Sequence, residues 1–218
     1  MDDHPDIKWS SQLEDIIASE AERCRGYAWI HQRAELVLSK KNNTLAIPVI
    51  VLSTLSGTAS IGSQSLFGDN QYASVGIGCV SILVGILQTL SSYFAFARKA
   101  EAHHQAYLQY SKLFSWIQVE LGLPREERAE PEQILSQLRD QMSRLAETTP
   151  LPPMSILDLF NKTFKDYDKT IARPLETNGL HRIVVHRPLP KPLSTDQLGF
   201  SIENPLRNEG KKDSPTQQ

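Results

Sequence analysis

The chain has 218 residues, of which 40% are hydrophobic and 22% are charged, and its formal net charge at pH 7 is -2. This balance, without a run of Lys and Arg that forms a phosphate-binding stripe, gives no reason to expect nucleic-acid binding. The two cysteines, Cys24 and Cys79, do not make a disulfide framework, which fits a reducing compartment. The charges are spread unevenly, because residues 45–97 contain one charged side chain, Asp69.

Residues 1–44 predict a long amphipathic helix. Apolar positions recur there at spacings of three and four; they are Trp9, Leu13, Ile16, Ile17, Ala21, Cys24, Ala28 and His31. His31 falls on the apolar side, where we expect a hydrogen-bonded core histidine rather than a ligand. The acidic, amphipathic N-terminus does not have the pattern of a cleavable signal peptide, so the internal apolar segments would direct membrane insertion.

Two apolar segments predict transmembrane helices at residues 45–61 and 73–97, joined by a short non-cytosolic loop at 62–72. The first, LAIPVIVLSTLSGTASI, is near the lower length limit for crossing a hydrocarbon core of roughly 30 Å, and a buried helix of a soluble bundle is the alternative. The second is uncharged and long enough to span with some tilt. Pro48 is expected either to kink the first helix or to lie in its first turn.

Basic and aromatic residues mark one end of both predicted spans. Lys40 and Lys41 precede the first span, Tyr93 lies near the end of the second, and Arg98 and Lys99 follow it. The connecting loop has no Lys or Arg. By the positive-inside rule, these five residues are the predicted interface anchors, the lipid bilayer is the predicted partner, and both termini are cytosolic.

Both spans are rich in glycine and hydroxyl side chains. Small residues four apart allow close helix approach in lipid, whereas a polar side chain at depth either bonds to a nearby group or lines a water-filled pore. The predicted helix-packing or pore-lining residues are Ser53, Gly57, Ser60, Gly78, Ser81, Gly85 and Gln88. We expect packing within the hairpin, between hairpins, or both, and therefore a homo-oligomer.

Residues 98–169 predict a second cytosolic helical region. One apolar stripe runs from residue 106 to 121, another helix begins near Pro131, and a shorter helix covers residues 155–164. These stripes and the N-terminal helix are expected to pack together as a bundle. Residues 170–218 are Pro-rich and polar, which predicts a disordered tail.

No catalytic or ligand-binding motif stands out in the sequence. A Gly-rich phosphate loop, a nucleophile elbow and a metal-binding HExxH or CxxC pair are all missing. His103 and His104 are adjacent and therefore point about 100° apart on a helix, so a solvated pair is expected rather than a shared metal site. We expect no enzyme, no cofactor and no metal.

Four segments, in order and within residues 20–165, carry a family resemblance. They are CRGYAWIHQRA, KKNNTLAIPVIVLSTLSGTASIG, VSILVGILQTL leading to FARKAEAHHQAY, and ELGLPREERAEPEQIL with its downstream PLPP turn. The chain resembles the SLATT family, short for SMODS and SLOG-associating two-transmembrane effector domain. It is most similar to the stand-alone form found in large DNA viruses and some eukaryotes.

The resemblance implies a membrane effector, in which a nucleotide-activated sensor triggers oligomers that form pores or perturb the membrane. We expect no nucleotide-sensing domain in this chain, which would depart from the sensor-coupled arrangement. The alternative is a membrane anchor or scaffold without channel activity, for example one that links a viral capsid or coat to a membrane and binds a cytosolic protein. The expected fold is all-α, a two-transmembrane hairpin whose long cytosolic helices form a bundle.

Overall fold

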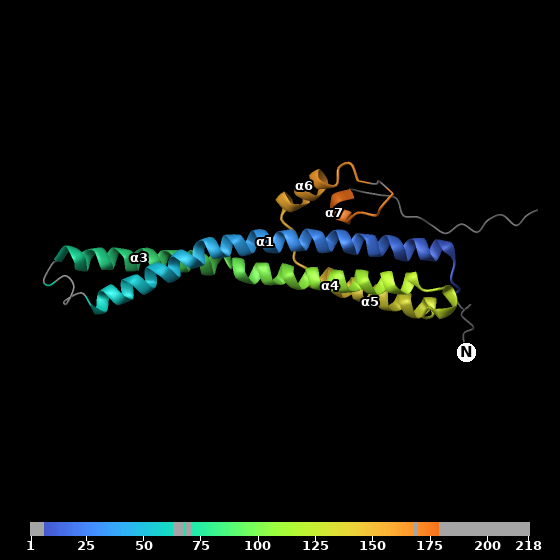
Figure 1. Ribbon diagram of the computed structural model, residues 1–218, viewed down its shortest axis with the longest axis horizontal. Helices are drawn as coiled ribbons and strands as arrows, with labels where there is room; N and C mark the ends of the chain where they lie inside the picture. Colours follow the sequence, from blue (N-terminus) through green and yellow to red (C-terminus); the bar gives the residue numbers. More distant parts are fainter. Residues whose placement is uncertain (1–6, 63–67, 69–70, 168–169, 179–218) are drawn as a thin grey trace, which may run out of the picture. The chain divides into compact units, whose positions relative to one another are not determined.

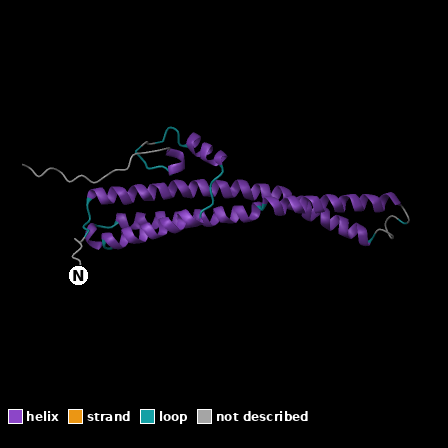
Figure 2. Cartoon of the chain, turned by 180° about the vertical axis from the view of Figure 1, so that it is seen from behind, coloured by secondary structure: helices purple, strands orange, loops and turns teal. Residues whose placement is uncertain are grey.

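The computed structural model describes residues 7–62, 68, 71–167 and 170–178 (Figure 1). Every regular element within these ranges is helical, as the purple ribbon of Figure 2 shows. The elements in chain order are α1 (Ser11–Ile61), α3 (Gln71–Phe94), α4 (Phe96–Gly122), the 3-10 turn η1 (Arg125–Glu127), α5 (Pro131–Thr148), α6 (Met154–Thr163) and α7 (Leu175–Asn178). The prediction of an all-α fold is confirmed.

Helix α1 joins the predicted N-terminal helix and the first predicted span without a break. Its start is fixed by Ser10, whose hydroxyl accepts a hydrogen bond from the Leu13 N–H at 3.3 Å. At its end, the Gly62 N–H donates to the Thr58 carbonyl at 3.0 Å. Pro48 lies deep inside the helix, so of the two alternatives the one that places it in a first turn was wrong. Because proline has no N–H, one backbone hydrogen bond is missing there.

The second predicted span does not run unbroken to residue 97. Helix α3 ends at Phe94, and Ala95 adopts a left-handed conformation with φ 48° before α4 begins. The least exposed residues of α3 recur at alternating spacings of four and three residues. In an unbroken helix this pattern would continue to Arg98 and Glu101 and turn both toward α1. The break rotates the following residues, so that apolar residues and His103 face α1 instead. The side chains of Arg98 and Glu101 thereby stay exposed.

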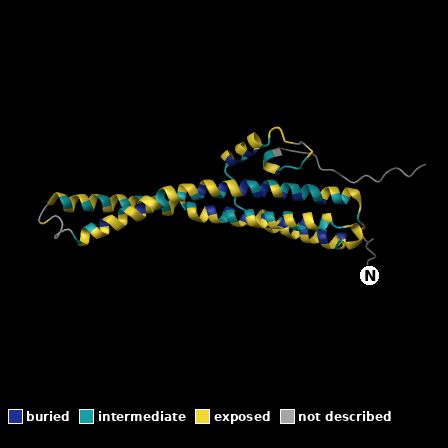
Figure 3. Cartoon of the chain, viewed as in Figure 1, coloured by how far each residue is buried: buried dark blue, intermediate teal, exposed yellow. Residues whose placement is uncertain are grey.

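Helices α1, α4 and α5 form a bundle, and Figure 3 shows its buried positions in dark blue where these helices lie together. The core contains Ile17, Ala21, Cys24, Tyr27, Ala28, Ala106, Tyr110, Leu113, Ile117, Ile134, Leu138 and Leu145. These residues include most of the three predicted apolar stripes, so the predicted bundle is confirmed. The exception is Ile16, which is exposed.

A second, smaller core joins α6 to α1. It contains Ile30, Ala34, Ile156 and Phe160. The segment that follows α6 also packs on α1: the Ala172 N–H donates to the Glu22 carboxylate at 2.6 Å, and the Leu175 N–H donates to the Tyr27 hydroxyl at 3.2 Å.

Gly26 of α1 makes room for this segment. A Cβ atom at that position would lie 2.6 Å from the ring of Pro174, which is fully buried. The structure therefore differs from the predicted tail over residues 170–178, which are held against α1 and include α7. Residues 179–218 of that prediction lie outside the described residues.

Candidate functional site

The candidate functional site is the hairpin of α3 and the C-terminal part of α1. Both helices are long and apolar enough to cross a membrane. None of the α3 residues is buried, and after Leu38 the buried residues of α1 are Val49 and Ser56. The hairpin therefore leaves its apolar surface uncovered by the rest of the described chain, in contrast to the bundle (Figure 3).

The two helices meet along a regular seam. The less exposed residues of α3 are Ala73, Ile77, Val80, Val84, Leu87 and Ser91, and those facing them on α1 include Val49, Leu52, Ser56 and Ala59. A spacing of four and three is that of two helices packed at a small angle. Across the seam, the hydroxyls of Ser56 and Ser81 lie 2.8 Å apart in one hydrogen bond.

One side of the seam is built from small and polar residues, which we call the small-residue side. Apart from Ile50, which follows Val49, the residues that follow the seam positions are all small or polar: Ser53, Gly57, Ser60, Ser74, Gly78, Ser81, Gly85, Gln88 and Ser92. In two antiparallel right-handed helices, the positions that follow the seam lie on the same side of the pair. A groove of about 310 Å³ confirms this, because Ser53, Gly57 and Ser60 line it together with Ser81.

The opposite side of the seam, which we call the large-residue side, carries mostly larger apolar side chains. It is formed by the residues that precede the seam positions, including Val51, Leu55, Cys79, Leu83, Ile86 and Leu90. All of these side chains are exposed in the structure. All seven residues predicted for helix packing or pore lining thus lie on the small-residue side. The two sides of the hairpin therefore differ in the size and polarity of their side chains.

Several hydroxyl groups of the hairpin form hydrogen bonds with carbonyls of their own helix. Ser53 and Thr54 donate to the Ile50 carbonyl at 3.0 and 2.8 Å, and Ser81 donates to the Ile77 carbonyl at 2.9 Å. Thr89 donates to Gly85 at 2.9 Å. These are the local bonds to the carbonyl three or four residues earlier that Ser and Thr commonly make within a helix.

The Gln88 amide differs from these hydroxyls. Its side chain is exposed and has no hydrogen bond with any residue that the structure describes. Gln88 precedes Ala97 by nine residues, which places it roughly 13 Å along the helix from the end of the predicted span. An amide at that depth in hydrocarbon costs several kcal/mol unless water or another chain supplies a partner.

The predicted anchors gather at one end of the hairpin. Lys40, Lys41, Arg98 and Lys99 are all exposed, and the Lys41 ammonium lies 6.0 Å from the centre of the Phe96 ring. That contact brings the basic end of the first span to the level of the basic end of the second. Tyr93 is exposed and makes an edge contact with Phe94.

Next to this end, two histidines form a buried pair that the sequence did not predict. The Nδ1 atoms of His31 and His103 lie 2.8 Å apart, so one imidazole donates and the other accepts. His31 also stacks on Tyr110 at 5.7 Å, and Tyr110 stacks on Tyr27 at 5.0 Å. The prediction of a core role for His31 is confirmed. The solvated role predicted for His103 was wrong, because this side chain faces α1 and is buried.

Both imidazoles are held in the neutral form by their surroundings. Burial, with a further contribution from His103, lowers the pKa of His31 to about 4, and burial lowers the pKa of His103. A hydrogen bond between two imidazoles requires an unprotonated acceptor, which the lowered pKa values provide. The pair therefore joins α1 to α4 at neutral pH.

Within the described residues, no group of three His, Cys, Asp or Glu side chains could hold a metal ion. Comparison with known proteins gives no relative, since no family model, curated protein or solved structure matches the chain.

Proposed function

We propose that this chain is a two-span membrane protein whose copies associate through the small-residue side of the hairpin. The observation that carries the proposal is the sorting of side chains around the seam: small and polar residues on one side, larger apolar residues on the other. On this proposal, residues 45–61 and 73–97 lie in the bilayer, and the bundle lies on the cytosolic side with Lys40, Lys41, Arg98 and Lys99.

The chemistry of lipid supports association on this side. Lipid tails solvate Leu55 or Leu83 as well as another protein would, so the large-residue side gains little from a partner. Glycine and serine instead allow a second helix to approach closely, and the Gln88 amide gains a partner when another copy or enclosed water faces it. The groove beside Ser53 and Ser81 offers the space for this approach.

A ring of such hairpins would turn its small-residue sides inward. Gln88 and the hydroxyl side chains would then face an enclosed, polar centre, which is the arrangement of a membrane-perturbing or pore-forming effector. The resemblance to SLATT effectors supports the same function. The second candidate is a membrane anchor or scaffold without a channel, and the hydroxyl groups bonded to their own helices favour it.

Cysteine cross-linking in membranes tests the association. In a Cys79→Ala background, Ser53→Cys and Gly85→Cys place a thiol on the small-residue side, and Leu55→Cys and Leu83→Cys place one on the large-residue side. We expect oxidation to give dimers for the first two variants and not for the last two. Equal cross-linking on both sides would remove the basis for the proposed interface.

Dye release from vesicles separates the two candidate functions. A pore-forming assembly releases a small dye, and Gln88→Leu changes the rate because it removes the amide from the enclosed centre. A scaffold cross-links in the same way but leaves vesicles intact at high protein density. In that case, cross-linking with mass spectrometry should recover a cytosolic partner on the bundle.

A further inference from the structure

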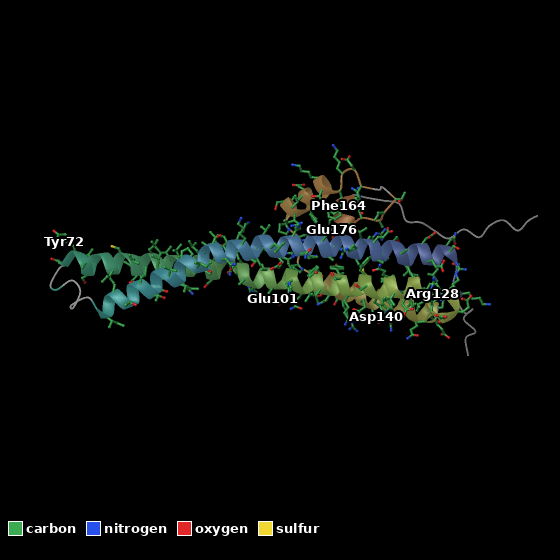
Figure 4. The ribbon with its side chains drawn as sticks, in the orientation of Figure 1. Tyr72, Glu101, Arg128, Asp140, Phe164 and Glu176 are labelled. Atoms are coloured by element: carbon green, nitrogen blue, oxygen red, sulfur yellow. The ribbon has the colours of Figure 1, made fainter. Side chains whose placement is uncertain are left out.

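An aromatic groove lies on α1 beside α6, in the bundle and away from the hairpin. Its walls come from α1, from Phe114 of α4, from Phe160 and Phe164, and from the segment that precedes α7. Figure 4 labels Phe164 over α1. The volume is about 370 Å³. Small-molecule sites typically have about 300–1,000 Å³, mostly apolar and aromatic walls and a few polar groups.

The aromatic rings hold one another in place. Trp29 meets Phe160 and Phe164 edge to face, with ring centres 5.5 and 5.3 Å apart, and Phe160 lies 4.7 Å from Phe164. Rings fixed in this way form flat apolar walls before any ligand arrives, so little order is lost on binding. Such walls suit a flat aromatic or acyl group.

The charges of the groove leave one cation without a partner. The Arg25 guanidinium lies 5.6 Å from the centre of the Phe114 ring and has no hydrogen bond or ion pair with any described residue. The Glu22 carboxylate already accepts the Ala172 N–H, and Arg173 donates to the Phe164 carbonyl at 2.7 Å.

Two other arginines of the bundle are paired with a carboxylate. Arg125 and Arg128 both bind the Glu14 carboxylate, which fixes the turn after α4 on the start of α1. Arg128 also lies over an aromatic ring, that of Trp9 at 5.1 Å, but Arg25 lies over Phe114 without a carboxylate partner among the described residues. Its N–H groups are therefore free for an anion.

We infer that the aromatic groove binds an amphipathic organic anion: a flat aromatic or acyl body carrying a carboxylate, sulfonate or phosphate. The body lies between Trp29, Phe114 and Phe160, and the anionic group pairs with Arg25. Arg173 adds a second positive charge nearby.

The anion comes from solution rather than from the bilayer, a point that rests on the proposed membrane boundary at Leu45. Trp29 precedes Leu45 on the same continuous helix, which places the groove roughly 24 Å from the boundary at 1.5 Å per residue. Lipid headgroups in the bilayer do not reach that far.

Isothermal titration of the full-length protein in detergent tests the inference, with detergent at one concentration in cell and syringe. The probes are naphthalene-2-sulfonate and its neutral counterpart naphthalene-2-sulfonamide. We expect the sulfonate to bind at least fivefold more tightly than the sulfonamide. Arg25→Gln should weaken sulfonate binding fivefold to tenfold and leave sulfonamide binding unchanged.

Arg33→Gln is the matched control. Arg33 lies on the same helix with its guanidinium 5.3 Å from the centre of the Trp29 ring, but it does not line the groove. Its replacement should leave both affinities unchanged. Ile171→Trp, which fills the groove, should abolish binding of both probes, and circular dichroism checks that each variant folds.

Three results would overturn the inference: no binding of the sulfonate, equal affinity for the two probes, or equal losses in Arg25→Gln and Arg33→Gln. Titration in nanodiscs with and without an anionic lipid tests the source of the anion. Unchanged sulfonate affinity supports a soluble ligand, whereas competition by the anionic lipid would assign the groove to headgroups. None of these measurements depends on self-association of the hairpin, so the proposed function and this inference fail separately.

Discussion

Helix α1 runs through two regions that differ in how many of its side chains are buried. Between Ile17 and Leu38 it buries nine residues against α4, α5 and α6, whereas beyond Leu38 it buries Val49 and Ser56. The helical geometry is the same in both regions. The bundle hides its apolar residues within one chain, whereas the hairpin leaves them uncovered by the described chain. On the proposed function, a lipid bilayer and other copies cover them. Folding of the first region is therefore intramolecular, and completion of the second depends on its surroundings.

The largest expected effect on the free energy of unfolding comes from matched isoleucine replacements, one in each region. Ile117 is 1% exposed in the bundle, and Ile82 is 67% exposed on α3. We expect Ile117→Ala to lower the free energy of unfolding of the bundle by about 2–5 kcal/mol, because it leaves a cavity. Ile82→Ala should change it by about 0.5 kcal/mol or less. Denaturant titration followed by circular dichroism in detergent provides the values, and equal losses would end the distinction between the regions.

Replacing the histidine pair tests whether His31 and His103 couple α1 to α4. His31→Leu leaves His103 buried without its partner, which should cost about 1–3 kcal/mol of stability. Adding His103→Leu removes both polar groups and should cost clearly less than the sum of the single replacements. The same double-mutant cycle on Ser56 and Ser81 serves as the comparison within the hairpin. Additive losses at the histidines would mean that the pair does not couple α1 to α4.

Acid should weaken the bundle through the same pair. An unfolded histidine binds a proton near its ordinary pKa of 6.5, whereas folded His31 does so only near 4. Unfolding therefore takes up protons between these values, and stability falls as the pH drops through this window. The loss from His31 should reach roughly 2 kcal/mol at pH 5. Thermal melts from pH 7.5 to 5 should show a shallower decline for the double leucine variant, which lacks both imidazoles; identical slopes would refute the assignment.

Helix α3 and helix α4 meet at the break at Ala95, and replacements of this residue have the smallest expected effect on stability. A left-handed conformation is unfavourable for alanine, so Ala95→Gly should stabilise the protein by up to about 1 kcal/mol. Ala95→Val should destabilise it, because a branched side chain tolerates this conformation less well. A stabilising Ala95→Val variant would show that the helix prefers to run unbroken.

Local periodicity was enough to predict most of the fold. Tyr110, Leu113 and Ile117 follow the spacing of a buried helix face, and Pro131 marks a helix start, so the bundle and its helices could be predicted. The break at Ala95 could not be predicted, because alanine favours helix. The reason for the break is which residues of α4 face α1, and that depends on how the two helices pack. Its only signal is that the spacing in α3, continued past Phe94, would bury Arg98 and Glu101.

Contacts between distant parts of the chain could not be predicted from the sequence for a related reason. His103 meets His31 only once α4 is packed against α1, and Pro174 is buried only because Gly26 leaves space for its ring. The small residues of the hairpin were predicted as a set, but their common side follows from the antiparallel seam. The aromatic groove combines Trp29, Phe114 and Phe160 from three helices and leaves no local motif.

The two native cysteines provide the most direct test of the proposed difference between the regions. Cys24 is buried in the bundle, where burial raises the pKa of its thiol to about 12, whereas Cys79 is exposed on the large-residue side of α3. The measurement is labelling of intact membranes from either side by a membrane-impermeant maleimide, with exposed Tyr72→Cys as the reactive control. We predict that neither native cysteine reacts until a denaturing detergent is added, because the protein shields Cys24 and lipid shields Cys79. Rapid labelling of Cys79 in intact membranes, at the rate of the control, would contradict a hairpin that lies in the bilayer.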